Sequence, residues 1–354
     1  MSSNRTDTYY KGLNALRAFS VVLVVLMHLH SYDFLEKYHL QFLWPILGGN
    51  AGVNLFFSIS GFLITEILIN QKLAGNFSVK NFLFRRILRI FPLYYLFLFI
   101  VLFFAILHII PVNKLHFLSS LCYVSNFLPT KNISTILGHT WSLAVEEHFY
   151  LLWPFLVLKL NKKTLLKIIV LGITICVISY FIIYNHSSSN SFQYYQFTIP
   201  AILPIFFGSL LAYIKNYYSP QVFKKIFFGL NFLIPTFVFF ILIFIPQIDF
   251  IFYPFFNSII YFFVIGYIIS YQNSTFVNLI ENPILSYIGK ISYGLYIWQG
   301  LFIGSGSSLS IVIFNYHISK FPINIFFTLI FSVLSFHFFE KRFLLLKDKY
   351  FSNK

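Results

Sequence analysis

The sequence predicts an all-α protein built as a polytopic integral membrane bundle of about ten transmembrane helices. Three observations lead to this prediction. First, 58% of the 354 residues are hydrophobic and only 10% are charged, which is too little polar surface for a soluble domain. Second, apolar runs of about 20 residues, the length that crosses a bilayer, recur along the whole chain. Third, the lysines and arginines stand at the ends of these runs.

Windows of about 19 residues place the individual spans. The runs leave no room for a separate soluble domain of about 100 residues, so we expect one membrane-embedded domain over residues 1–354. The apolar piece 117–127 is too short to cross a bilayer and is expected to be interfacial or re-entrant. The expected spans are residues 13–32, 47–70, 90–110, 141–160, 165–184, 198–214, 226–246, 251–271, 284–305 and 322–340.

The basic residues predict the orientation of the chain. With the N-terminus in the cytoplasm, 21 of the 25 lysines and arginines lie on the inner side. The positive-inside rule therefore predicts that both termini are cytoplasmic, which agrees with an even number of spans. The outer side keeps Lys37, Lys114, Lys131 and Lys320.

Charge and cysteine usage exclude two other classes of protein. The net charge of +15 is not gathered into a basic stripe, so we expect no nucleic-acid partner. Cys122 and Cys176 are the two cysteines, and they form no CxxC pattern, which argues against a disulfide framework or redox chemistry.

The first span carries two ionisable residues, Arg17 and His28, which are costly inside a bilayer unless they face a cavity or the bundle interior. They are eleven residues apart, so they return to nearly the same helix face about 16 Å apart along the axis. In one interpretation Arg17 extends its charge to the interface and His28 is a packing residue. In the other, a neutral His28 takes a proton from a hydroxyl.

The segment before the third span contains Arg85, Arg86 and Arg89, which are spaced to project over a common sector of one helix. Arginines at a membrane edge often bind lipid headgroups or set topology. Guanidinium groups also bind phosphates through two parallel hydrogen bonds. The cluster therefore predicts either a topology signal or a site for an anionic cytosolic cofactor.

Glu146 and Glu147 enter the fourth span, where a run of apolar residues follows them. Such carboxylates could orient a histidine or bind the hydroxyls of an acceptor, and Glu146 is favoured because it shares a face with Ser142. A metal site with His139 and His148 lacks the i,i+4 histidine pair of a zinc helix, so no metal is expected. At the end of the last span, Glu340 is either a site residue or an ion-pair partner for the bases that follow it.

Taken in order, these segments resemble the membrane acyltransferase-3 family, whose multi-span enzymes acylate sugars and other molecules at the bacterial surface. The resemblance covers nearly the whole chain, and its parts are modest singly but specific in their order. Departures include His148, which stands where the family usually has Gln. The matching segments are LNALRAFSVVLVVLMH, GVNLFFSISGFLIT, RRILRIFPLYY, TWSLAVEEHFYLLWP, ISYGLYIWQ and FHFFEKRF.

The resemblance implies roles for the candidate residues. It places the catalytic base at His28, with Arg17 on the same motif, and the binding of the acyl-CoA donor at Arg86 and Arg89, beside Arg85. The family's carboxylates fall on Glu146, Glu147 and Glu340. Whether the base acts directly or through an acyl-histidine stays open, because both routes use the same residue.

The implied function is a membrane O-acyltransferase in a bacterial inner membrane, surrounded by membrane lipids. It would move an acyl group, with acetyl expected, from cytoplasmic acyl-CoA to a hydroxyl of a surface polysaccharide or lipid-linked sugar. Donor and acceptor would approach from opposite faces, because charge counting puts the arginines inside and Glu146 outside. Two rivals are a permease with an intramembrane substrate or proton path through Arg, His and Glu, and a catalytically silent glycan-binding or assembly subunit.

Overall fold

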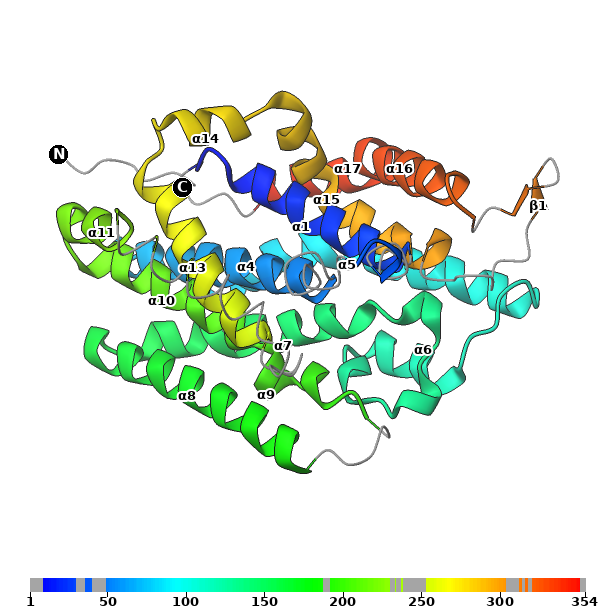
Figure 1. Cartoon of the computed structure of the whole chain (residues 1–354), viewed down its shortest axis with the longest axis horizontal. Helices are drawn as coiled ribbons and strands as arrows, with labels where there is room; N and C mark the ends of the chain where they lie inside the picture. Colours follow the sequence, from blue (N-terminus) through cyan, green and yellow to red (C-terminus); the bar gives the residue numbers. More distant parts are fainter. Residues whose placement is uncertain are drawn as a thin grey trace. The chain divides into compact units, whose positions relative to one another are not determined.

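The computed structural model of this chain is almost entirely helical in the part that it describes (Figure 1). Its only strands there are the two-residue antiparallel pair β1 (Val312–Ile313) and β2 (Tyr316–His317). The all-α prediction is therefore confirmed. The described residues are 9–29, 36–39, 49–186, 192–229, 233, 237, 253–303, 312–313, 316–317 and 320–350.

Five helices in these described ranges are long and apolar enough to cross a membrane. The count of ten spans and the orientation of the termini stay predictions, and the expected span 226–246 lies mostly outside the described residues. The five are Asn50–Leu73, Val79–Ile106, Lys162–Asn185, Tyr253–Ser270 and Ile323–Tyr350.

The chain divides into two compact units. Unit 1 comprises Met1–Phe77, Leu152–His186 and Ile199–Lys290, and unit 2 comprises Ser78–Leu151, Ser187–Thr198 and Ile291–Lys354. Helices α7 (Thr140–Lys159), α9 (Thr198–Ala201) and α15 (Pro283–Phe302) contribute residues to both. The other helices of unit 1 are α1 (Leu13–His28), α4 (Gly49–Leu73), α8 (Lys162–His186), α10 (Leu203–Tyr217), α11 (Pro220–Ile226), α13 (Tyr253–Ser270) and α14 (Thr275–Ile280).

Helix α4 is the centre of unit 1, where it packs against α1, α10 and α13 (Figure 1). Small residues allow the close approach. A Cβ atom on Gly61 would lie 2.1 Å from the carbonyl oxygen of Ile205, and one on Gly208 would lie 2.1 Å from that of Ser58. Gly52 likewise lies against the backbone of Ser20 in α1. The glycines of the second expected span thus serve helix packing, as in other membrane bundles.

A buried carboxylate joins three parts of unit 1. Glu66 of α4 accepts hydrogen bonds from Tyr10 and from Lys215 of α10, and the ammonium of Lys215 lies 5.1 Å from the centre of the Tyr10 ring. At the preceding residue, Trp153 donates to Thr65 over 2.8 Å, and Thr65 donates to Ser209 over 2.9 Å. These bonds satisfy polar groups that would otherwise be costly in an apolar core.

The start of α1 is held by residues from the other end of unit 1. Gly12 adopts a φ of 84°, a left-handed conformation that glycine takes without strain. Its N–H donates to Glu281 over 2.5 Å, and Tyr9 and Ser286 donate to the same carboxylate. Partial burial alone would raise the pKa of Glu281, but these hydrogen bonds hold it below its usual value.

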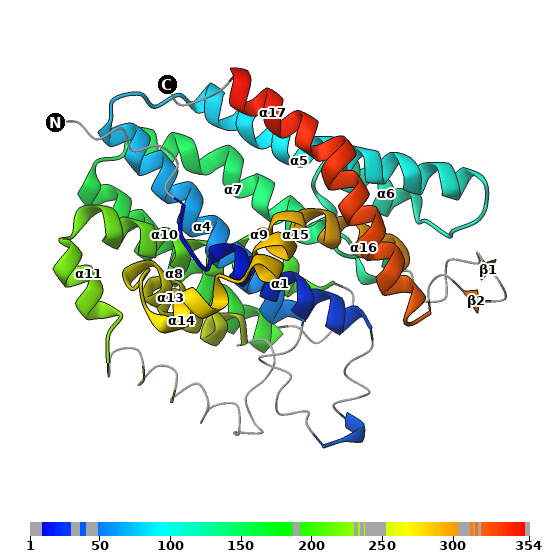
Figure 2. The same cartoon turned by 90° about the horizontal axis from the view of Figure 1, so that it is seen from above.

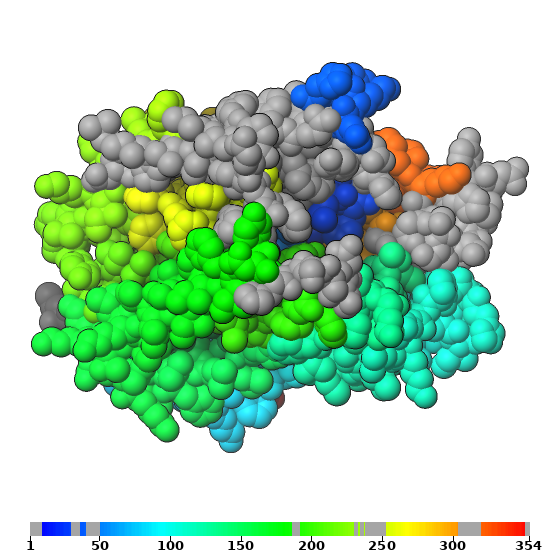
Figure 3. All heavy atoms as spheres, turned by 60° about the horizontal axis from the view of Figure 1, so that its bottom comes forward, coloured from blue at the N-terminus to red at the C-terminus, as the bar shows by residue number. Residues whose placement is uncertain are grey.

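Helix α8 shows how the protein meets lipid. Only 17% of its most apolar window is buried, although its mean hydropathy there is 2.5. Apolar side chains that face outward suit a lipid environment rather than water. In Figure 3 the green side chains of this part of the chain cover much of the lower left of the surface.

In unit 2 the long helix α5 packs against the C-terminal helix α17, beside which it runs in Figure 2. The π-helical turn η7 also contacts α5. The segment expected to be interfacial contains a helix of eight residues, α6, too short to cross a bilayer. The elements are α5 (Val79–Ile106), α6 (Lys114–Leu121), the 3-10 turns η2 (Ser125–Phe127), η3 (Thr130–Asn132), η4 (Thr135–Leu137) and η5 (Tyr194–Gln196), then α16 (Ile323–Ser335), η7 (Phe336–Glu340) and α17 (Lys341–Tyr350).

Candidate functional site

The sequence-predicted residues fall into two groups. Arg17 and His28 lie on α1 in unit 1. The arginines of α5, the carboxylates of α7 and Glu340 of η7 lie in unit 2. The structure brings together members of the second group, which are Arg85, Arg86, Arg89, Glu146, Glu147 and Glu340.

The ring of His28 is held in one orientation at the end of α1. Its Nδ1 atom lies 2.8 Å from the backbone carbonyl of Val24, one turn earlier. A carbonyl can only accept, so Nδ1 carries a proton, and in the neutral ring Nε2 carries the basic lone pair. The half-buried His28 therefore presents Nε2 as the atom that can take a proton.

Arg17 lies on the same helix, eleven residues before His28. It is half-buried, and its Nη1 atom donates to the side-chain oxygen of Asn14 over 3.3 Å. The helix between Arg17 and His28 is continuous, so the separation of about 16 Å expected from the sequence holds.

Helix α5 begins at Val79, eleven residues earlier than the span expected to start at residue 90. Arg86 is therefore about 10 Å inside the helix rather than at its end. Its guanidinium lies 5.4 Å from the centre of the Phe82 ring and 5.7 Å from that of Tyr150, in the middle of α7. Aromatic faces attract a guanidinium, which explains why a helix can carry this charge among apolar residues.

Arg86 and Arg89 meet different partners although they are three residues apart. Arg86 interacts electrostatically with Tyr150 and Glu146 of α7. Arg89 is exposed and interacts electrostatically with Glu340. The cluster thus links α5 to two other elements of unit 2, in addition to presenting basic charge.

Glu147 is the more buried of the two adjacent carboxylates of α7, with 8% of its surface exposed. One of its oxygens, Oε1, has no hydrogen-bond partner among the described residues. Ser142, the residue that favoured Glu146 in the sequence, instead bonds to the hydroxyl of Tyr296 and to the carbonyl of His139. The structure thus gives both carboxylates a place in the cluster, since both interact electrostatically with Arg86.

Glu340 is buried at the end of the π-helical turn. It accepts a hydrogen bond of 3.0 Å from Ser335, which in turn accepts one of 3.0 Å from Trp298 of α15. A Cβ atom on Gly294 would lie 3.3 Å from its Oε1, so the glycine of the ISYGLYIWQ segment gives this carboxylate room. Glu340 is thereby fixed toward Arg89.

Sequence reasoning missed the tyrosines of this cluster. Tyr293 interacts electrostatically with Glu147 and Glu340, and its hydroxyl donates to the carbonyl of Ile90 over 2.7 Å. Tyr150 lies one turn after Glu146 and contacts Arg86. Its i,i+4 spacing from Glu146 was a usable signal, whereas nothing in the sequence linked Tyr293 to α7.

The histidines near the α7 carboxylates have other partners. His139 packs against Gly300, where a side chain would collide with its ring, and His148 bonds to Thr198 over 2.8 Å. Among the described residues, no group of three or more histidine, cysteine, aspartate or glutamate side chains could hold a metal ion.

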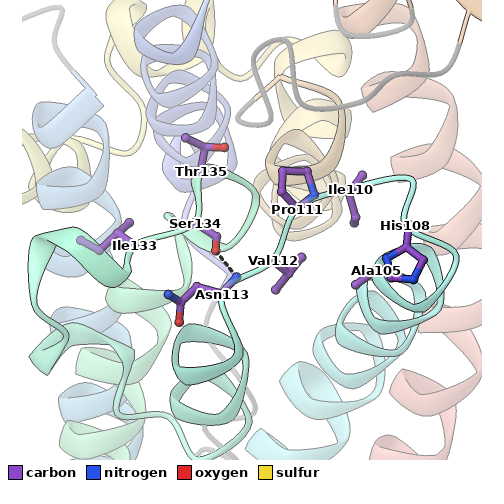
Figure 4. Close-up of a pocket in the computed structure, with 9 residues that line it drawn as sticks. All are labelled: Ala105, His108, Ile110, Pro111, Val112, Asn113, Ile133, Ser134 and Thr135. Atoms are coloured by element: carbon purple, nitrogen blue, oxygen red, sulfur yellow. Dashed lines mark hydrogen bonds between the residues drawn. The ribbon is translucent and has the colours of Figure 1, made fainter.

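A pocket of about 600 Å³ lies at the C-terminal end of α5, away from the residues predicted from the sequence. Figure 4 shows Ser134 beside Asn113, whose N–H donates to the Ser134 hydroxyl over 2.8 Å. Behind them, burial lowers the pKa of His116 to about 4, and its Nδ1 accepts the N–H of Ser134 over 2.8 Å. The lining mixes apolar and polar residues and consists of Ala105, His108, Ile110, Pro111, Val112, Asn113, Ile133, Ser134 and Thr135.

Comparison with known proteins adds named relatives. The chain is 31% identical over 320 residues to the peptidoglycan O-acetyltransferase OatA of Listeria monocytogenes, covering 82% of this chain and 49% of the relative. It is 29% identical over 315 residues to the O-acetyltransferase OatA of Staphylococcus aureus, covering 82% of this chain and 50% of the relative. The chain thus spans about half the length of the curated relatives that it matches.

No solved protein structure matches the chain significantly. The sequence model of the family described as an acyltransferase domain, in contrast, matches residues 10–337. This stretch includes α1 with Arg17 and His28 and, in unit 2, the arginines of α5 with Glu146 and Glu147, whereas Glu340 lies three residues beyond its end. The chain therefore belongs to the acyltransferase-3 family of membrane proteins.

Proposed function

We propose that this protein is a membrane O-acyltransferase that moves an acetyl group from cytoplasmic acetyl-CoA to a hydroxyl of a cell-surface glycan. The observation that carries the proposal is the hydrogen bond between Nδ1 of His28 and the carbonyl of Val24. It leaves Nε2 as the basic nitrogen of a neutral imidazole, which is the form that a general base needs. Membership of the acyltransferase family supports this assignment.

The reaction moves an acetyl group from the sulfur of a thioester to the oxygen of a hydroxyl. The acceptor hydroxyl gives its proton to Nε2 of His28 while its oxygen attacks the carbonyl carbon of the thioester. The carbon–sulfur bond then breaks, and the departing CoA thiolate takes the proton from His28 to leave as the free thiol. In the acyl-histidine variant, the same Nε2 attacks the thioester carbon first and the CoA thiolate leaves. The acceptor hydroxyl then takes the acyl group from the ring, and its proton passes to the thiolate, which leaves as the free thiol.

The arginines of α5 are proposed to hold the donor. Arg89 is exposed and Arg85 is half-buried, so both can meet the phosphates of a cytosolic CoA. Arg86 lies deeper, between Phe82 and Tyr150, where its charge can interact with a developing negative charge as well as with Glu146. Arg17 of α1 is also proposed to help hold the donor.

The acceptor is proposed to be a peptidoglycan or related surface glycan, or its lipid-linked precursor. A relative that shares 31% of its residues over 82% of this chain is a peptidoglycan O-acetyltransferase. Glu146 and Glu147 can accept hydrogen bonds from sugar hydroxyls. Glu340 is proposed to keep Arg89 in place through their electrostatic interaction.

Mass spectrometry of envelope glycans tests this function. Cells that produce the protein should carry glycans heavier by one acetyl group per modified hydroxyl, and cells without it should lack the increment. Cells with the His28→Ala variant should match those without the protein, provided that the variant is present in the membrane at wild-type amounts. Uptake of a solute without any modified glycan would contradict the proposal and favour a permease.

A further inference from the structure

The helix α6 ends in a way that singles out one tyrosine. Tyr123 N–H donates to the carbonyl of Ser120 over 3.1 Å, and Val124 N–H donates to that of Ser119 over 2.9 Å. These two bonds form a Schellman motif, with Tyr123 at the position that glycine usually occupies. Its φ of 55° lies in the left-handed region, which is an outlier for a bulky residue.

Helix α4 ends in the same motif with the expected residue. There Gly75 N–H donates to Lys72 and Asn76 N–H donates to Gln71, each over 3.2 Å. A Cβ atom on Gly75 would meet nothing within 4 Å, so the motif alone does not select a side chain. The chain thus retains a strained tyrosine at the end of α6, although glycine would end the helix with less strain.

Neighbouring groups hold the Tyr123 side chain and backbone firmly. Its ring stacks on Tyr94 at 4.6 Å and on Phe91 at 5.3 Å between ring centres. The ring of His148 donates a hydrogen bond to the Tyr123 backbone while it also bonds to Thr198. His148, the residue that follows Glu147, therefore bonds directly to the backbone of Tyr123.

These contacts hold the ring and backbone of Tyr123 but do not involve its hydroxyl group. The residue is buried, yet its hydroxyl has no hydrogen-bond partner in the described part of the chain. Oε1 of Glu147 is a second buried polar atom without such a partner, and the two groups interact electrostatically. Buried polar groups are paired in most proteins, so two unpaired ones that interact electrostatically have the capacity to bind a further group.

We propose that Tyr123 and Glu147 form the subsite that binds a hydroxyl of the sugar acceptor. A sugar hydroxyl both donates and accepts, so it can donate to Glu147 Oε1 while it accepts from the Tyr123 hydroxyl. This inference rests on the proposed function for the identity of the ligand, and it adds Tyr123 as a residue that determines acceptor binding.

The position of the pair agrees with a surface acceptor. Tyr123 follows the short helix α6 in the stretch that charge counting places outside, and Glu147 lies about 10 Å from the start of α7 at Thr140. Tyr123 stacks on Phe91 and Tyr94, so it is expected farther from the cytoplasmic start of α5 than Arg86 is.

The test measures binding of a sugar probe by the full chain in detergent, without acetyl-CoA. The probe is the disaccharide of N-acetylglucosamine and N-acetylmuramic acid, and the readout is its Kd by calorimetry. Tyr123→Phe keeps the stacked ring and removes only the hydroxyl. It should weaken binding roughly fivefold to tenfold, as expected for one lost hydrogen bond.

Two further variants complete the design. Tyr95→Phe removes a neighbouring hydroxyl that already donates to the carbonyl of Leu121 over 3.2 Å, so it should leave the Kd within about twofold of wild type. Glu147→Gln should weaken binding, and adding Tyr123→Phe to it should cost less than Tyr123→Phe costs alone, because the two groups hold the same hydroxyl.

The outcomes separate this inference from the proposed function. Equal Kd values for wild type and Tyr123→Phe, with matching thermal unfolding curves, would overturn the subsite and leave its place to an ordered water. Equal losses in Tyr123→Phe and Tyr95→Phe would also overturn it. Weakened binding in Tyr123→Phe alone would support the subsite even if no acetyl transfer were found, an outcome that would count against the proposed function only.

Discussion

Two carboxylates buried in membrane helices have opposite surroundings. Glu66 of α4 is bonded to Lys215 and Tyr10, so its charge is matched within unit 1. Glu147 of α7 has one oxygen without a hydrogen-bond partner among the described residues of unit 2. A buried carboxylate with all its partners stabilises a fold, whereas one that lacks a partner has capacity to bind something else. The comparison therefore assigns a structural role to Glu66 and a functional role to Glu147.

His28 extends this comparison to the catalytic step. Its Nδ1 atom donates a hydrogen bond to a backbone carbonyl, so this atom has a structural partner, as Glu66 has. Its Nε2 atom is the one that can accept a proton from a substrate. Replacing His28 should therefore affect rate rather than folding.

The largest expected effect is that of His28→Ala, which should lower the rate of acetyl transfer by about 10²–10⁴-fold because the general base is lost. The ring is half-buried at a helix end, so the variant should insert and unfold like wild type. The rate is measured as release of free CoA thiol in the presence of the sugar acceptor. Transfer at the wild-type rate would remove His28 from the mechanism.

The two carboxylates themselves provide the next test. Glu66→Leu leaves the ammonium of Lys215 without its partner and should lower the free energy of unfolding by about 2–4 kcal/mol. Glu147→Leu should leave that free energy unchanged or raise it, because it removes an unsatisfied buried group, and should lower acetyl transfer. Chemical unfolding in detergent measures the first quantity and CoA release the second. If Glu147→Leu destabilised the protein as much as Glu66→Leu, the two carboxylates would have the same structural role.

The arginines of α5 sharpen the comparison on the donor side. Arg86→Ala and Arg89→Ala should each raise the KM for acetyl-CoA about tenfold and leave the KM for the acceptor unchanged. Lysine should restore function better at position 89, which is exposed, than at position 86, where the planar guanidinium lies between Phe82 and Tyr150. If both alanine variants had an unchanged KM for acetyl-CoA, the arginines would not bind the donor, and their role would be in topology or lipid binding.

The smallest effect concerns His116, a buried residue whose Nδ1 atom accepts a hydrogen bond from the N–H of Ser134. Burial lowers its pKa to about 4 in the folded protein, below the unfolded value of about 6.5. The unfolded chain therefore binds more protons between these values, and stability should fall as the pH drops from about 6.5 to about 4. Thermal unfolding across this pH range should show a shallower decline in His116→Gln. An identical decline in both proteins would mean that other groups dominate.

The sequence predicted some parts of the structure well for physical reasons. The helices Gly49–Leu73, Thr140–Lys159 and Tyr253–Ser270 lie within a few residues of the expected spans, because a helix inside a bilayer needs a long apolar run. The start of α5 was misplaced because hydropathy windows penalise arginine. Contacts of Arg86 with Phe82 and Tyr150, which no window can see, keep the helix going.

The candidate site was predictable as residues but not as contacts. The spacing of Arg17 and His28 on one helix follows from helical geometry alone. The choice between Glu146 and Glu147 does not, because the hydroxyl of Ser142 is taken by Tyr296 from a helix 154 residues away. Tyr123 carried no signal either, since its left-handed backbone depends on how α6 ends.

The central claim is that an acetyl group passes from a donor on the cytoplasmic side to an acceptor on the outer side. The most direct measurement uses proteoliposomes of uniform orientation, with labelled acetyl-CoA and the N-acetylglucosamine–N-acetylmuramic acid disaccharide on chosen faces. Donor on the face of the α5 arginines and acceptor on the opposite face should give labelled sugar, and donor on the outer face alone should not. Labelled sugar formed only when both substrates share the inner face would contradict the account and mean that acylation precedes export of the sugar.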